Sequence, residues 1–150
     1  GNGLSSRLFI ELREKQGLAY EVSSFYPTRV GRSQFVVYMG TAPENTAIAL
    51  AGLRREVDRL TDTNLTEDEL QAAKNKLLGQ YALGKQTNSQ IAHILGWYEM
   101  LGLGLDYDRQ FQDEVAAVTT EKALAVAQAY FQTRYISALG PAEAMAAITP

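Results

Sequence analysis

The stretch GNGLSSRLFIELREKQGLAYEVSSFY, residues 1–26, decides how the rest of the chain is arranged. It predicts a glycine-containing loop, a helix and the first strand of a hairpin. Leucines recur every four residues, which is typical of a helix with one buried face: Leu4, Leu8 and Leu12. Ser5 or Ser6 can cap this helix, and Gly17 can end it. Residues 19–26 are rich in β-branched and aromatic side chains, which favours a strand directly after the helix.

Two side chains flank the predicted turn between helix and strand, Arg13 and Tyr20. A guanidinium is a permanently charged fork of hydrogen-bond donors and a phenol is a further donor, so together they could hold a peptide carbonyl group. Spacing alone favours a structural interpretation instead. In that interpretation Arg13 forms a surface ion pair with Glu11 or Glu14, and Tyr20 simply packs.

The remaining residues predict a hairpin followed by helices. Residues 19–26 and 34–40 are expected to pair as antiparallel strands around a turn at 29–32. Thr41–Glu44 and Thr66–Glu69 have the capping-box pattern that begins a helix. Helices are then expected over five ranges: from the first box to about 60, from 66 to about 83, 89–101, 107–115 and 120–131. A closing strand is expected over 135–140.

The spacing of apolar residues predicts which helix faces are buried. In the first of these helices the predicted buried positions are Leu50, Leu53, Val57 and Leu60. The charged positions are predicted to face solvent: Arg54, Arg55, Glu56, Asp58 and Arg59. In the second helix the predicted buried positions are Leu70, Ala73, Leu77 and Tyr81. Trp97 and Tyr98 are also predicted to be core residues.

Three blocks of the sequence agree in residue type and spacing with a known signature: LSSRLF at 4–9, ELREK at 11–15 and GLAY at 17–20. They closely resemble the pitrilysin/insulinase family of zinc metallopeptidases, which includes the mitochondrial processing peptidases. The resemblance is to the non-catalytic, C-terminal half of that family. Weaker agreement continues through residues 65–70, 73–75 and 118–119, so it covers nearly the whole chain.

The element order predicts an α+β fold with helices on one face of a mainly antiparallel sheet, and the resemblance implies the related LuxS/MPP-like metallohydrolase fold. It further implies that a full domain begins with a strand and a helix ahead of residue 1. We therefore expect residues 1–150 to form a single, partial domain, with residues 142–150 as a frayed tail. An uncovered sheet edge could pair with a second copy of the fragment as a homodimer.

Composition narrows the function classes. The net charge of −3 and the mixed charges argue against a nucleic-acid partner. No apolar run approaches the roughly 20 residues that a membrane-spanning helix needs, so membrane insertion is not expected. The absence of cysteine leaves the cellular compartment open. Carboxylate pairs such as Asp106/Asp108 are interpreted as helix-terminal or surface charges rather than an acid–base pair.

The family's zinc site places two histidines on one helix face. This chain has one histidine, His93, so neither a zinc site nor catalytic residues are expected in it. The resemblance implies that zinc belongs to a partner, a catalytic domain or subunit of the same family. It implies that this domain closes the peptide chamber, and that Arg13 and Tyr20 face the zinc site and bind the substrate backbone.

Two other functions stay open at this stage. The chain could be a structural or assembly subunit of the same fold, with no peptidase activity in either half. It could also be a free-standing peptide-binding module, which would bind unstructured peptides without a partner.

Overall fold

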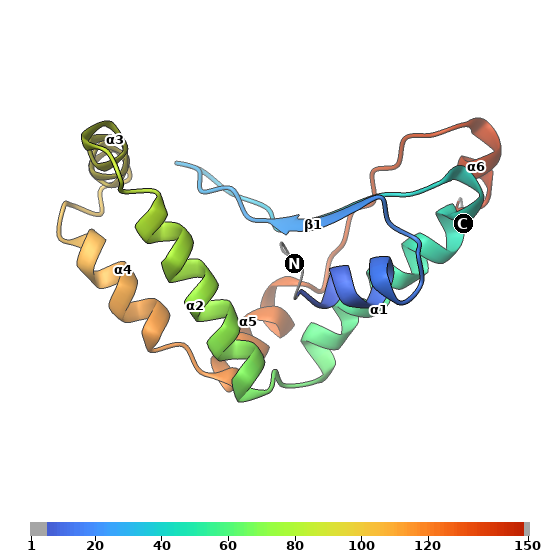
Figure 1. The fold of residues 1–150 in the computed structure, drawn as a ribbon, viewed down its shortest axis with the longest axis horizontal. Coiled ribbons are helices and arrows are strands. Elements are labelled where there is room, and N and C mark those ends of the chain that lie inside the picture. Colours follow the sequence, from blue (N-terminus) through green and yellow to red (C-terminus); the bar gives the residue numbers. More distant parts are fainter. Residues whose placement is uncertain (1–5, 149–150) are drawn as a thin grey trace. The chain divides into compact units, whose positions relative to one another are not determined.

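The computed structural model describes residues 6–148, and these fall into two compact units. One unit extends up to Asp62 and resumes at Ala129, and the other extends from Thr63 to Gln128. Figure 1 labels the elements. The first unit holds the helix η1, the hairpin, the helix α1 and a short C-terminal helix. The second unit consists of helices.

The first helix, η1 (Phe9–Glu14), is a π-helix in which the Lys15 amide donates to the Ile10 carbonyl at 3.0 Å. At the start of this helix, the Phe9 amide donates to the Ser6 hydroxyl at 3.3 Å. Ser6 therefore accepts from an amide of the first turn, as expected. The predicted residues Leu4 and Ser5 lie outside the described residues. Gly17 ends the helical segment with a φ of 63°, which glycine adopts at little cost, and this prediction is confirmed.

The hairpin consists of β1 (Glu21–Phe25) and β2 (Val36–Gly40), paired antiparallel from Glu21↔Gly40 to Phe25↔Val36. The predicted pairing is confirmed, although the strands are shorter than expected and residues 26–35 connect them. One face of the hairpin packs on the buried Leu8 and Leu12 of the helix beside it, through these residues: Val22, Val37 and Met39. The other face leaves Phe25 and Tyr38 about half exposed, so β2 is not covered on both faces.

The expected capping box at Thr41–Glu44 is wrong. The Thr41 hydroxyl donates instead to the Leu18 carbonyl at 2.6 Å, and so ties the end of β2 to the segment before β1. A short 3-10 turn, η2 (Pro43–Asn45), begins after Ala42, and α1 (Thr46–Asp62) follows it. A tertiary hydrogen bond has therefore taken the hydroxyl that the local pattern assigned to the helix terminus.

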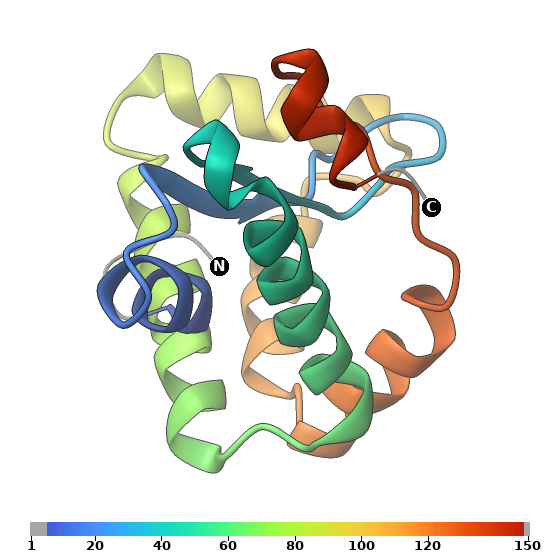
Figure 2. The same cartoon turned by 90° about the vertical axis from the view of Figure 1, so that its right-hand side faces the viewer.

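The buried face of α1 also differs from the prediction. Its buried residues are Ala49, Gly52 and Glu56, whereas the four predicted apolar residues are only half-buried. Placing Glu56 on the solvent face was wrong, because the side chain lies against η1 rather than in water. Figure 2 shows α1 beside the hairpin. At Gly52 the reason is the close approach of η1, whose Leu12 side chain occupies the space that a side chain at position 52 would need.

The second unit begins with α2 (Glu67–Leu83), whose predicted capping box is confirmed: the Glu69 amide donates to the Thr66 hydroxyl at 3.2 Å and the Thr66 amide to the Glu69 carboxylate at 2.9 Å. The next helix, α3 (Asn88–Met100), starts with a second capping box formed by Thr87 and Gln90, one residue earlier than expected. Two further helices follow: α4 (Tyr107–Ala116) and α5 (Thr120–Tyr130).

The predicted buried face of α2 is only partly correct. Leu70 is buried and Tyr81 is half-buried, but Ala73 and Leu77 are exposed. The half-buried residues between Leu70 and Tyr81 are Lys74 and Leu78. Figure 1 shows α4 running beside α2, and the Lys74 ammonium donates to the Ala116 carbonyl at the end of α4 at 2.8 Å. The buried face of α2 is therefore shifted by about one residue from the predicted face, because it packs toward α4.

The expected closing strand at 135–140 is wrong, because this segment pairs with no strand of the described residues and is exposed throughout. Tyr135 and Leu139 are 94% and 101% exposed. A short helix, α6 (Ala142–Ala146), follows with Ala144 buried. The predicted α+β class is confirmed by the antiparallel pair and its helices. No helix within residues 6–148 is long and apolar enough to span a bilayer.

Candidate functional site

Arg13 projects from η1 and is exposed. Its guanidinium carbon lies 4.9 Å from the centre of the Phe9 ring, a cation–π contact along the same helix. The expected ion pair with Glu11 or Glu14 is not found, and within residues 6–148 the Arg13 guanidinium has no salt bridge. Its donors are therefore available for a ligand.

Tyr20 lies seven residues further on, just before β1. Its amide donates to the Gly40 carbonyl at 2.9 Å, which holds its backbone against β2. Its side chain is 89% exposed, so the alternative in which Tyr20 packs does not describe this structure. Both side chains predicted as site residues are thus exposed, one at each end of the same turn. No hydrogen bond or ring contact between the two is found in the described part of the chain.

Hydrogen bonds and burial hold the backbone of this turn firmly. The Gly17 amide donates to the Arg13 carbonyl at 3.0 Å, and the Leu18 amide donates to the Leu12 carbonyl at 2.9 Å. Leu12, directly before Arg13, is buried, and so are Leu18 and Ala19, directly before Tyr20. The sequence therefore folds so that small or aliphatic residues anchor the turn while Arg13 and Tyr20 remain outside it.

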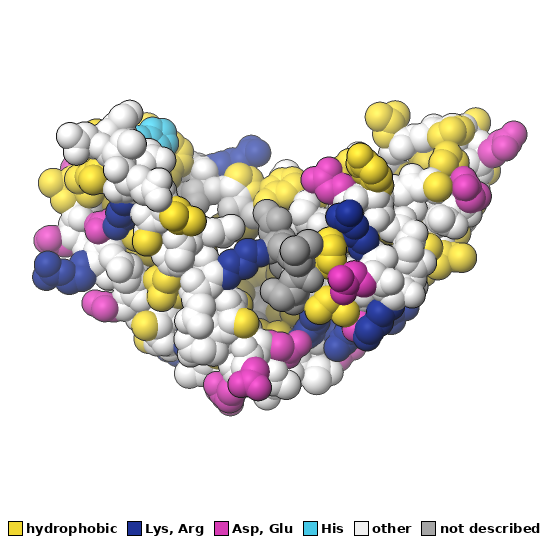
Figure 3. Space-filling view, viewed as in Figure 1, with side chains coloured by type: hydrophobic (Ala, Val, Ile, Leu, Met, Phe, Trp, Pro, Cys, Tyr) yellow, Lys and Arg dark blue, Asp and Glu magenta, His cyan; other side chains and the backbone are white. Residues whose placement is uncertain are grey.

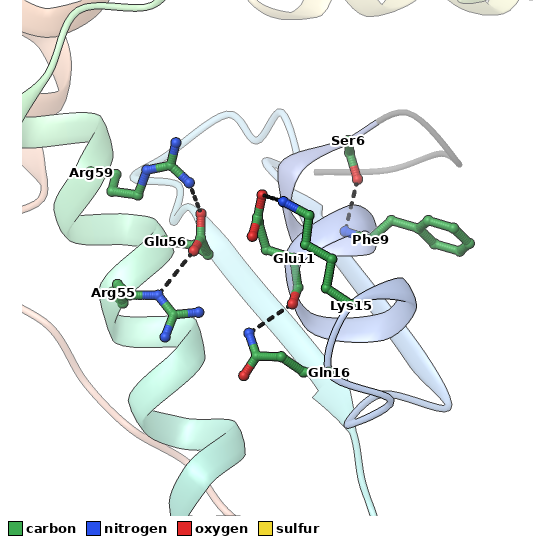
Figure 4. A network of polar contacts seen from close by, with 8 residues as sticks. All are labelled: Ser6, Phe9, Glu11, Lys15, Gln16, Arg55, Glu56 and Arg59. Carbon is green, nitrogen blue, oxygen red and sulfur yellow. Dashed lines mark hydrogen bonds and ion pairs between the residues drawn. The ribbon is translucent and has the colours of Figure 1, made fainter.

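Charged side chains of η1 and α1 lie close to this turn, and each helix forms its own ion pairs (Figure 4). Glu56 is 4% exposed and accepts from Arg55 at 3.2 Å and from Arg59 at 2.9 Å. On η1, Lys15 binds Glu11 at 2.8 Å. The Lys15 hydrogen bond holds the pKa of Glu11 below its ordinary value, and the charges of Arg59 and Arg55 add to this effect. Charges of alternating sign therefore line the junction between the two helices.

A polar cluster in the second unit was not predicted from the sequence. The Tyr98 and Tyr81 hydroxyls lie 2.6 Å apart, and Tyr81 donates to Asp108 at 2.5 Å. Lys85 binds the same carboxylate and lies 4.0 Å from the centre of the Tyr81 ring. Asp108 lies in the first turn of α4, as interpreted from the sequence, but its carboxylate also bonds to two side chains of the cluster. Periodicity identified Tyr81 and Tyr98 as packed residues, but no local pattern identifies the partners of their hydroxyls.

This cluster changes the acidity of its members. Burial, with the hydrogen bonds to Asp108 and Tyr98, raises the pKa of Tyr81 well above its ordinary value. The hydrogen bonds from Lys85 and Tyr81 lower the pKa of Asp108. Tyr98 is buried. The cluster therefore favours a protonated Tyr81 phenol and a charged Asp108 carboxylate, which suits a fixed connection between α2, α3 and α4.

The donor atoms of this chain do not fit a zinc site. His93, the single histidine, is exposed on α3 (cyan in Figure 3), and the chain has no cysteine. No group of three or more histidine, cysteine or acidic side chains within residues 6–148 is arranged to hold a metal ion. Structural zinc sites use four such ligands and catalytic sites use three.

Comparison with known proteins defines the class. The family described as "Peptidase M16 inactive domain" matches residues 1–77. An uncharacterised zinc protease of Streptomyces coelicolor is 34% identical over 94% of this chain and 31% of its own length. The chain therefore belongs to the peptidase M16 family as its inactive domain. The resemblance to the non-catalytic half of the pitrilysin/insulinase peptidases is confirmed.

Solved structures agree with this assignment. The crystal structure of a peptidase M16 inactive domain from Pseudomonas fluorescens has a TM-score of 0.77 and 28% identity, covering 86% of this chain and 31% of that one. A protease from Helicobacter pylori has the same fold, with a TM-score of 0.68 at 20% identity, over 88% of this chain and 32% of its own. The chain spans about a third of the length of the relatives that it matches.

Proposed function

We propose that this domain is the non-catalytic half of a zinc-dependent endopeptidase, where it closes a peptide chamber against a catalytic domain or subunit and binds the substrate with Arg13 and Tyr20. The observation that carries the proposal is that both side chains are exposed on a firmly held turn, and that Arg13 has no carboxylate partner within residues 6–148. Zinc would be supplied by the partner.

The chemistry of the two side chains suits an extended peptide. Peptide carbonyl oxygens accept hydrogen bonds, and a guanidinium and a phenol hydroxyl can both donate them. A guanidinium is permanently charged, so Arg13 would favour the negative charge that develops on a carbonyl oxygen during hydrolysis. The backbone hydrogen bonds on both sides of the turn limit the reorganisation that binding would require.

The decisive experiment is Arg13→Ala in the enzyme assembled from this domain and its catalytic partner. A charge-assisted hydrogen bond of about 1.5–3 kcal/mol corresponds to roughly 10- to 150-fold in kcat/KM, so we expect a loss in that range. Arg54→Ala is the matched control, because Arg54 is also exposed and lies on α1. Unchanged kcat/KM in Arg13→Ala would contradict the substrate-binding role.

Tyr20→Phe tests the second donor while the aromatic ring is kept. We expect about a 5- to 10-fold loss of kcat/KM, because a neutral hydrogen bond contributes about 1 kcal/mol. Tyr135→Phe, at a similarly exposed tyrosine, should leave kcat/KM unchanged. An assembled enzyme that cleaves no peptide with or without added zinc would instead support a structural subunit.

A further inference from the structure

We propose that Gly52 on α1 is a positioning residue for Arg13, acting through the side chain of Leu12; this inference rests on the proposed function of Arg13. Gly52 and Arg13 lie on different helices, and it is Leu12, the residue before Arg13, that connects them. The absence of a side chain at position 52 lets η1 approach α1 closely enough to fix its winding.

The contact leaves no room for a larger residue. A Cβ atom at position 52 would lie 2.6 Å from Cδ2 of Leu12, and 3.9 Å from its Cγ. Contacts under 3.0 Å force atoms to move. Leu12 is 0% exposed, so its side chain is enclosed on all sides and has little freedom to turn away. The strain of a new methyl group would therefore pass into the backbone of η1.

The winding of η1 determines where Arg13 points. Residues Phe9–Glu14 form a π-helix, in which bonds join residues five apart, and this winding has more residues per turn than the 3.6 of an α-helix. A change toward α-helical winding would rotate every side chain after Phe9. Arg13 would then leave its place above the Phe9 ring, which points away from α1 in Figure 4.

Within residues 6–148, no salt bridge fixes the direction of Arg13. Its described side-chain contact, with Phe9, joins two residues four apart on the same helix, so it depends on the winding of that helix. The nearby ion pairs hold other residues of the junction, namely Lys15 with Glu11 and both arginines with Glu56. The Leu12–Gly52 contact is therefore the point where the packing of α1 acts on the residue next to Arg13.

The structural test uses the assembled enzyme with ¹⁵N-labelled arginine. In Gly52→Ala we expect the NMR signal of the Arg13 side-chain Nε–Hε group to shift, because the proton moves relative to the Phe9 ring. Gly79→Ala is the control, since Gly79 is also helical and a Cβ there would meet nothing within 4 Å. An unshifted Arg13 signal in Gly52→Ala overturns the inference, whatever the activity.

A double variant tests whether the contact between position 52 and Leu12 causes the shift. Gly52→Ala/Leu12→Val adds a methyl group on α1 and removes a carbon from Leu12, so we expect the wild-type Arg13 signal to return. If Gly52→Ala does not fold, Leu12→Met replaces the branched end that rests on Gly52 with a chain of similar volume. Leu12→Met should then shift the Arg13 signal, and the same signal as wild type would overturn the inference.

The kinetic test separates this inference from the proposed function. We expect Gly52→Ala to lower kcat/KM by about 10-fold, because small misplacement of a binding group is costly. In an Arg13→Ala background the same change should cost nothing further, since the affected group is already absent. An equal loss in both backgrounds would overturn the positioning role. If Arg13→Ala alone has no effect, the proposed function fails, and the Arg13 signal alone decides whether Gly52 orients it.

Discussion

The two units of the molecule are stabilised in different ways. The core of the first unit is aliphatic, formed by buried residues in or next to η1 and β1: Leu8, Leu12, Ala19 and Val22. The second unit has aromatic rings that also carry hydrogen bonds, where Tyr98, Tyr81 and Asp108 connect three helices. Ring contacts extend this cluster through Tyr107 and Phe111.

This difference predicts which substitutions destabilise each unit. An aliphatic core depends on volume, because removal of buried carbon atoms loses transfer free energy and leaves a cavity. A hydrogen-bonded aromatic cluster depends on single polar atoms, because a partner left without its hydrogen bond carries the desolvation cost. The first unit should therefore respond to truncation, and the second to the loss of one oxygen atom or one proton.

The largest expected effect is that of Leu12→Ala on the first unit. Large-to-small substitutions of fully buried leucines cost about 2–5 kcal/mol, and Leu12 is fully buried. We expect this loss in the free energy of opening measured by hydrogen exchange of the β1 and β2 amides, with little change in α2. Leu139→Ala, at a fully exposed leucine of the same unit, should change it by less than about 0.5 kcal/mol. Equal losses in both units would remove the contrast between them.

Tyr81→Phe should produce the next largest effect, in the second unit. The variant keeps the ring and removes one oxygen, which leaves the hydroxyl of Tyr98 and the carboxylate of Asp108 without that partner. We expect a loss of about 1–2 kcal/mol, seen as faster exchange of the α2 and α3 amides. Tyr135→Phe, at an exposed tyrosine, is the control. No loss in Tyr81→Phe would mean that the rings alone stabilise this unit.

Thr66→Ala removes the capping box of α2. Loss of a threonine cap costs about 1 kcal/mol, because amides at the helix N-terminus lose their acceptor. The exchange of the first-turn amides of α2 should increase, while that of the hairpin should not. Thr63→Ala, three residues earlier and exposed, is the matched control. An equal response to both substitutions would show that the cap contributes nothing.

Acid should destabilise the second unit selectively, and by the smallest amount. The hydrogen bond from Lys85 lowers the pKa of Asp108 in the folded state. The charged carboxylate therefore stabilises the unit above the unfolded pKa of aspartate, near 4, and this contribution is lost as the pH falls through the lower folded value. We expect at most about 1 kcal/mol, because the pair is partly exposed.

Hydrogen exchange of the α4 amides as a function of pH would measure this loss. Asp108→Asn removes the titrating group, so its exchange should lack the acid-dependent step of the wild-type chain after correction for intrinsic rates. The same step in Asp108→Asn would assign the acid sensitivity to another carboxylate.

Local patterns in the sequence were sufficient for a substantial part of this protein. The four-residue spacing of leucines identified the buried positions Leu8 and Leu12, and Gly17 identified the end of the helix. The capping box at Thr66 was also correct, because it involves only residues within one turn of each other. The exposure of Tyr20, and the lack of a salt bridge at Arg13 within residues 6–148, did not follow from such patterns, because spacing alone favoured packing for Tyr20 and a surface ion pair for Arg13.

The failures share a physical cause. Thr41 bonds to Leu18, residues 135–140 pair with no strand within residues 6–148, and Glu56 is buried. In each case the outcome depends on which group from a distant part of the chain comes close. Helical periodicity describes one helix in isolation, so it cannot state which side of α1 a neighbour will approach.

By itself, the sequence determined the family, the α+β class, the existence of the helices and the hairpin pairing, because residues close along the chain specify these features. The tertiary structure alone decided that Leu12 rests on Gly52, that the Thr41 hydroxyl bonds to the Leu18 carbonyl, and that two phenols and a carboxylate connect α2, α3 and α4. These contacts join residues distant in sequence, and their energies depend on distances that only the folded chain defines.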